Sequence, residues 1–185
     1  MSTETIILAL LVLAVIIMYN SLISKKNQVD NIFASVDTQL KKRYDLIPNL
    51  VATVSKYMEH EKTLLTEVTR LRSEANNPNL SDTHKINLDK KVSSALGSIM
   101  VAVENYPDLK ANENVMQLQG TLHELEEQIS AARRAYNQAV TDYNNAIEMF
   151  PTNFMAKAMN YRAKQVFEIS HNERQNVNVK ELFNS

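Results

Sequence analysis

Histidine and carboxylate side chains are the residues whose spacing comes closest to that of a metal-binding or hydrolytic site. Among the four histidines, His171 alone follows a carboxylate at the Glu-x-x-His spacing, with Glu168 as the partner. A di-iron helical bundle needs that pair from each of two helices. His60 and His123 are each followed by glutamate but lack the second histidine of a zinc-protease helix. The histidines therefore indicate neither a metal site nor a hydrolase.

Composition excludes further classes of function. The chain has no cysteine, which rules out a disulfide framework, a thiolate metal site, a catalytic thiol and a lipidated cysteine. Two glycines are too few for a phosphate-binding loop, and no serine lies in a nucleophile elbow. The net charge of −1 gives no field that would hold nucleic acid. We therefore expect a protein that is not an enzyme, uses no cofactor or metal and binds no nucleic acid.

Polar and charged side chains in two segments suit recognition of another molecule. The first segment surrounds a proline within a helical pattern, and its candidate interaction residues are Lys41, Lys42, Arg43, Tyr44, Asp45, Pro48 and Asn49. The second is a predicted loop with Tyr106, Pro107, Asp108 and Lys110. Each has a structural alternative: Tyr44 packs and Arg43 pairs with an acid across a helical bundle, whereas Pro107 starts a helix. The residues alone leave both readings open.

Acidic side chains gather in a third place, around the start of the third cytoplasmic helix predicted below. They are Glu104, Asp108, Glu113, Glu124, Glu126 and Glu127. Such a patch suits contact with the basic side chains from Lys41 to Arg43, in the same molecule or in a second copy. A solvated helix face is the alternative.

The element that must hold these segments in place begins with an apolar run. The run extends from Ile6 to Ile23 with a polar interruption only near its end. A helix over these residues covers about 27 Å, close to the ~30 Å hydrocarbon thickness of a bilayer. A signal peptide would need basic residues before the run and a small-residue cleavage site after it. Neither is present, so residues 6–23 are predicted to be an uncleaved transmembrane helix.

Charge on the two sides of the run predicts its orientation. Glu4 precedes the run, whereas Lys25 and Lys26 follow it directly. Because cytoplasmic flanks carry an excess of lysine and arginine, the tail of residues 1–5 is expected outside the membrane and the remainder in the cytoplasm.

Apolar residues after the anchor recur at helical spacing of three and four. A first stripe runs from Val29 to Val68 with no strong breaker before it, so one long helix is expected to continue from the anchor and to kink near Pro48. The loop signal Asn76–Asn79 separates it from a second helix, which Ser81 or Asp82 can cap.

The rest of the chain predicts two more helices. A stripe from Val115 to Ala146 keeps its spacing without a slip, as in coiled-coil packing, and a shorter helix is expected over Asn153–Phe167. The fold class is therefore all-α: an N-terminal transmembrane helix that continues into an antiparallel three- to four-helix bundle. The bundle is assigned to residues 24–169 and a flexible tail to residues 170–185.

Four blocks of sequence resemble the LemA family of bacterial membrane proteins. They are Gln39–Val51, Tyr106–Glu113, Ala132–Asn137 with Val140, Tyr143 and Asn144, and Phe150-Pro151. The resemblance implies a single-span protein of the bacterial inner membrane, N-terminus outside, with a cytoplasmic bundle and no established catalysis. It also adds Arg133, Tyr136 and Asn137 to the candidate interaction residues. The tail after residue 170 departs from the usual family ending.

Three functional hypotheses follow. Relatives in the family are associated with membrane proteases and with organelle-membrane biogenesis in magnetosome-forming bacteria. We expect a membrane-anchored scaffold that self-assembles into a homo-oligomer at the cytoplasmic face in envelope or membrane organisation. The alternative is an adaptor that presents clients to a membrane protein partner such as a protease, and a third is binding of a lipid or small ligand between helices near the kink.

Overall fold

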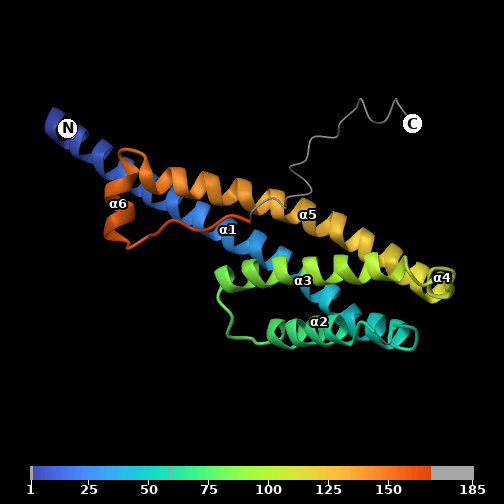
Figure 1. Cartoon of the computed structure of the whole chain (residues 1–185). Coiled ribbons are helices and arrows are strands. Elements are labelled where there is room, and N and C mark those ends of the chain that lie inside the picture. Colours follow the sequence, from blue (N-terminus) through green and yellow to red (C-terminus); the bar gives the residue numbers. More distant parts are fainter. Residues whose placement is uncertain (1, 59, 168–185) are drawn as a thin grey trace, which may run out of the picture.

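The computed structural model describes residues 2–58 and 60–167, and within these ranges it contains helices and connecting segments but no strand. The helices in chain order are α1 (Thr3–Val54), α2 (Lys62–Ala75), α3 (Asp82–Val103), α4 (Pro107–Lys110), α5 (Glu113–Glu148) and α6 (Thr152–Ala158). The predicted all-α class with a long apolar N-terminal helix is confirmed (Figure 1). The predicted tail over 170–185 and the Glu168–His171 pair lie outside the described residues.

Helix α1 joins the apolar run to the bundle without a break. It contains 52 residues, and its first part is long and apolar enough to cross a membrane. That part projects beyond the other helices (Figure 1), and the side chains from Ile6 to Ile17 are exposed. The second part carries the predicted stripe, whose members from Val29 to Val54 are buried apart from the half-buried Val51. The expected continuity of the apolar run with the first bundle helix is therefore confirmed.

Helix α5 is the main partner of α1 and runs alongside it in the opposite direction (Figure 1). Its predicted stripe is buried or half-buried along its whole length, from Val115 through Ile129 and Tyr136 to Tyr143. The Asn112 side chain caps its start by accepting hydrogen bonds from the backbone of Asn114 and Val115. Burial of this long stripe fixes the rotation of α5 about its axis.

The predicted first stripe is divided between two helices rather than carried by one. Helix α1 ends at Val54, and after a turn α2 folds back and packs with α3 as a helical hairpin on the distal part of α1 (Figure 1). A straight helix to Ala75 would extend about 30 Å past Val54 and leave Leu65 and Val68 without cover. The reversal buries both, and their burial favours it over the propensity for a longer helix.

The predicted helix over Asn153–Phe167 is wrong beyond its first half. Helix α6 ends at Ala158, and residues 161–167 are not helical. Asn160 adopts a left-handed backbone conformation with φ of 52°, and the Tyr161 amide donates to the Ala156 carbonyl at 2.9 Å. Such a bond closes a helix at its C-terminus. The segment that follows is held against α5 by side-chain contacts described below.

Candidate functional site

Four charged side chains form a cluster where α1, α3 and α5 meet; Arg43 and Asp89 are buried, whereas Arg133 and Glu126 reach the surface. Arg43 is almost fully buried and donates to Glu126 at 2.7 Å, to the Ser93 hydroxyl at 2.9 Å and to Asp89. Arg133 donates to the other Asp89 oxygen at 2.6 Å and to Glu126 at 3.3 Å. Two cations thus alternate with two anions, and each acid is shared by both arginines.

The charges in this cluster neutralise one another inside the bundle. Burial by itself lowers the pKa of Arg43, but the charges of Asp89 and Glu126 more than offset this, so its pKa is raised. The Nε atoms of Arg43 and Arg133 are buried without a hydrogen-bond partner among the described residues. Because these ion pairs join α1, α3 and α5, the cluster sets which residues of the three helices lie opposite one another.

This arrangement bears out the structural alternative for Arg43 and joins it to a second candidate, Arg133. It also brings in Asp89 and Ser93, which sequence reasoning missed. A signal for Asp89 was available, because it lies three and seven residues before Val92 and Leu96 of the buried stripe. An acid in register with an apolar stripe indicates a buried partner of opposite charge. Glu126 was singled out within the acidic patch, and it does meet the basic segment within one molecule.

The remaining candidates near Pro48 divide between core and surface. Tyr44 is buried, and burial raises the pKa of its hydroxyl to about 12. The other candidates of this segment, Lys41, Lys42, Asp45, Pro48 and Asn49, face solvent. Lys41 and Asp45 form an exposed ion pair at 2.8 Å one turn apart. These five side chains are accessible to another molecule, whereas Arg43 and Tyr44 are not.

Helix α1 continues through Pro48, which cannot donate a hydrogen bond to the Tyr44 carbonyl. The Nε of Arg72 on α2 donates to that carbonyl at 3.2 Å. An orphaned backbone acceptor thereby gains a partner from a different helix. Arg72 was not among the predicted site residues, and the kink predicted near Pro48 stays a prediction.

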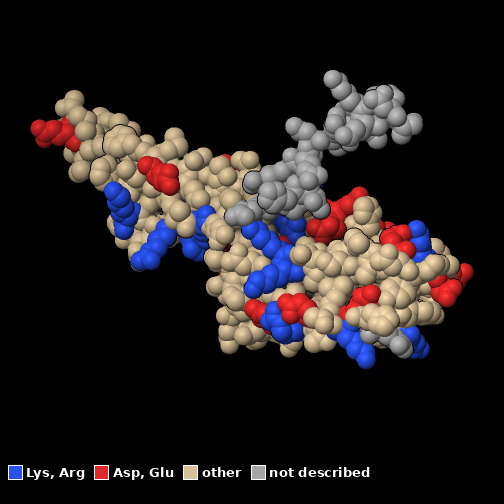
Figure 2. Space-filling view, viewed as in Figure 1, with Lys and Arg blue, Asp and Glu red and all other residues tan. Residues whose placement is uncertain are grey.

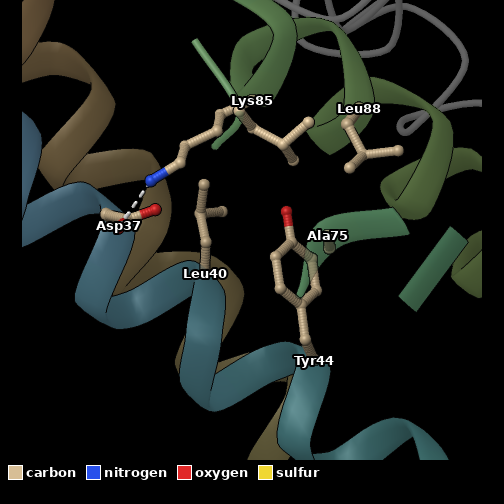
Figure 3. A pocket seen from close by; sticks show the side chains of 7 residues that line it. Asp37, Leu40, Tyr44, Ala75, Lys85 and Leu88 are labelled. Atoms are coloured by element: carbon tan, nitrogen blue, oxygen red, sulfur yellow. Dashed lines mark hydrogen bonds and ion pairs between the residues drawn. The ribbon is translucent and has the colours of Figure 1, made fainter. Parts of the chain in front are cut away.

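A small pocket lies beside Tyr44, between α1, the end of α2 and the start of α3 (Figure 3). The Tyr44 hydroxyl points into it, and Lys85 donates to Asp37 at 2.9 Å at its edge. Its volume of about 10 Å³ is enough for roughly one water molecule. The hypothesis of lipid or ligand binding near Pro48 therefore gains no support from this pocket.

Two asparagines of α5 hold the extended segment that follows α6. Asn137 donates to the Phe167 carbonyl and accepts from the Phe167 amide, both at 2.8 Å. Asn144 makes the same pair of bonds with Lys164, at 3.0 and 2.9 Å. Because the two asparagines are two turns apart on one face of α5, they hydrogen-bond the backbone of the extended segment at two points. We call each pair of bonds an asparagine clasp. The two clasps explain why residues 161–167 do not continue α6.

Removal of one clasp is expected to release the segment locally. N137A deletes both hydrogen bonds to Phe167, which should reduce stability by about 1–3 kcal/mol and expose the Phe167 amide to exchange. Hydrogen exchange read at that amide measures the effect. N145A is the matched control, because Asn145 lies on the exposed face of the same helix. Equal Phe167 exchange rates in N137A and the wild type would contradict the assignment.

The second predicted segment is partly engaged within the molecule. The Tyr106 hydroxyl donates to Glu61 at 2.7 Å, and Lys110 pairs with Glu104 at 2.5 Å. Pro107 begins α4, as the structural alternative anticipated, and it remains exposed together with Asp108.

Within the described residues no group of three or more histidine, aspartate or glutamate side chains is placed to hold a metal ion.

The sequence that contains these residues is similar to sequences of known proteins. The model of the LemA family matches residues 32–180, which include the charged cluster and both asparagine clasps. The chain belongs to the LemA family. This LemA-family chain is 28% identical over 165 residues to Protein LemA of Metamycoplasma hominis, an alignment that covers 89% of the chain and 75% of that protein.

Shorter stretches of this LemA-family protein are similar to proteins of magnetic bacteria. It is 31% identical over 75 residues to Magnetosome protein MamQ 2 of Paramagnetospirillum magneticum and 27% identical over 74 residues to Magnetosome protein MamQ of Magnetospirillum gryphiswaldense. These alignments cover 40% of the chain but only 28% and 27% of the two relatives. LemA is not a known enzyme family. Membership of the chain in this family, together with the apolar start of α1, is consistent with a membrane anchor.

Proposed function

We propose that this LemA-family protein is a non-enzymatic scaffold of the bacterial inner membrane that self-assembles at the cytoplasmic face. The observation that carries this proposal is the single helix α1, which provides both the apolar run and the spine of the bundle. A helix without a break transmits the position of the anchor to the bundle, since a flexible linker is absent. The lysines after the run support an orientation with the N-terminus outside.

Self-assembly is supported by tethering and by the distal end of the bundle. Copies fixed in one membrane meet at a raised effective concentration, so weak lateral contacts suffice to join them. Tyr57, Val101 and Met116 are exposed apolar side chains from the elements that end or begin there. The likeness to magnetosome proteins supports a role in membrane organisation, although it covers less than half of the chain.

Oligomeric state is the test of this proposal. Mass photometry of the full-length protein in mild detergent should show discrete species larger than a monomer, and V101E should shift them toward the monomer because it places a charge on the distal end. A131E is the matched control, since Ala131 is exposed on the mid-part of α5. A monomer at all concentrations would overturn self-assembly, and equal effects of the two variants would exclude the distal end as the contact.

An adaptor is the second candidate, favoured by the exposure of Pro107 and Asp108 on α4. They lie between Tyr106 and Lys110, which contact Glu61 and Glu104 within the molecule. Crosslinking in cells from position 108 should then recover one dominant membrane protein partner. Recovery of self-crosslinks alone would favour the scaffold instead.

A further inference from the structure

The connection between α5 and α6 presents an exposed apolar surface. Met149, Phe150 and Phe154 are 63%, 79% and 65% exposed, which is unusual for such large side chains. The rings of Phe150 and Phe154 contact each other edge to face, with 6.1 Å between their centroids. We call residues 149–154 the elbow. Its exposed aromatic pair has no partner among the described residues that covers it.

The elbow lies at the end of the bundle from which the apolar run of α1 projects. Helix α6 contacts both α1 and α5 and crosses α1 rather than following it (Figure 1). Leu22 of α1 is fully buried and Met18 half-buried, although both lie within the predicted span of residues 6–23. The covered part of α1 and the predicted span therefore overlap by about 9 Å, which brings the neighbouring elements to the level of the membrane surface.

Basic side chains outnumber acidic ones at this end of the molecule, where the acids include Glu148, which directly precedes the elbow and is exposed. Figure 2 shows Lys and Arg side chains gathered there. Two of the basic residues at this end belong to α1, and three belong to α6 or the segment after it: Lys25, Lys26, Lys157, Arg162 and Lys164. Asp30 is paired with Lys26 at 2.9 Å and with Lys164 at 2.5 Å. Lys157 and Arg162 are exposed and form no ion pair with a described residue.

We propose that the elbow docks into the interfacial layer of the same bilayer that α1 spans. This inference rests on the proposed membrane anchoring and adds a second contact to it. Phe150 and Phe154 lie at the boundary of headgroups and acyl chains, and Lys157 and Arg162 contact anionic headgroups. The lipid surface is favoured over a protein partner because the aromatic pair lies at the end of the bundle from which the apolar run projects and has exposed cations, Lys157 and Arg162, close to it in sequence. Two attachments fix the tilt of the bundle relative to the membrane.

The absence of tryptophan from the chain permits a direct test. F154W places a single indole on the elbow of the full-length protein, which is then reconstituted into phosphatidylcholine vesicles containing lipids brominated along their acyl chains. Y57W is the matched control at the distal end of the bundle, and Y19W reports on the anchor itself. We expect blue-shifted emission and loss of most of the fluorescence for F154W and Y19W, but not for Y57W.

The outcomes separate this inference from the anchoring on which it rests. Emission and quenching of F154W equal to those of Y57W, with Y19W quenched, would overturn docking of the elbow and leave the anchor intact. Failure of Y19W to be quenched would overturn both. A blue shift of F154W that disappears on dilution to one copy per vesicle, without quenching by brominated lipid, would assign the elbow to contact with a second copy and overturn the lipid contact.

The charged side chains are tested separately with anionic vesicles. Addition of phosphatidylglycerol should increase the quenching of F154W, and K157E/R162E in the same background should remove that increase. Both positions are exposed, so folding of the variant is expected to be preserved. Quenching that does not respond to phosphatidylglycerol would overturn the headgroup contact of Lys157 and Arg162.

Discussion

D89N is expected to destabilise the bundle by about 3–5 kcal/mol, the range for removal of one partner from a buried ion pair. Asp89 is almost fully buried and binds both Arg43 and Arg133. Without its charge, Glu126 alone remains to balance two arginines, and the Glu126 side chain is 45% exposed. Arg43 would then be the poorly compensated charge, because it has no path to solvent.

Thermal unfolding of the full-length protein in mild detergent, followed by circular dichroism, measures this loss. At about 2–4 °C per kcal/mol for a chain of this size, the midpoint should fall by roughly 6–20 °C. D45N is the matched control, since it breaks the exposed pair of Asp45 with Lys41 on α1 and should change stability by less than about 1 kcal/mol. Similar midpoints for D89N and D45N would contradict a structural role of the cluster.

A double variant distinguishes uncompensated charge from lost contacts. R43M/D89L removes one cation and one anion and leaves Arg133 with Glu126 as a balanced pair. Replacement of buried ion pairs by apolar residues is often neutral or stabilising. The double variant should therefore be more stable than D89N. If it is less stable, the contacts of the cluster matter more than its charge balance.

The two long helices of this fold could be predicted from the sequence because each follows from the spacing of apolar residues along one continuous segment. Helix α5 follows from one unbroken stripe, and the continuity of α1 follows from the absence of a breaker after Ile23. The reversal after Val54 left no comparable signal, because no proline or glycine marks it. Burial of Leu65 and Val68 against other elements decides it, and such contacts are not visible in a single stripe.

The arginines of the charged cluster could be predicted from the sequence, but Asp89, the acid that both of them bind, could not. A buried arginine needs an acid, and that requirement suggested pairing for Arg43 before any fold was known. Asp89 is 46 residues away in sequence, so its identity depends on how α3 packs. Asn137 was a candidate interaction residue, but its bonds to Phe167, like those of Asn144 to Lys164, were missed. The sequence favoured a helix to Phe167, whereas side-chain amides satisfy the backbone of an extended segment.

Y136A is expected to have an effect of similar size at the same α1–α5 interface, one helical turn along α5 from Arg133. The Tyr136 ring is buried between Phe33 and Phe167, with both centroid distances at 5.3 Å. Truncation of a buried aromatic to alanine typically reduces stability by about 3–5 kcal/mol, because it leaves a cavity as well as losing apolar contact. Phe167 would lose an aromatic neighbour, so the segment held by Asn137 should also loosen.

Y136F isolates the ring from the hydroxyl. The Tyr136 hydroxyl donates to the Gln165 carbonyl at 3.3 Å, a long hydrogen bond whose removal should reduce stability by about 1 kcal/mol or less. Thermal unfolding should therefore rank Y136F close to the wild type and Y136A far below it, and hydrogen exchange at Phe167 should increase in Y136A. If Y136F is as unstable as Y136A, the hydroxyl rather than aromatic packing joins residues 161–167 to the bundle.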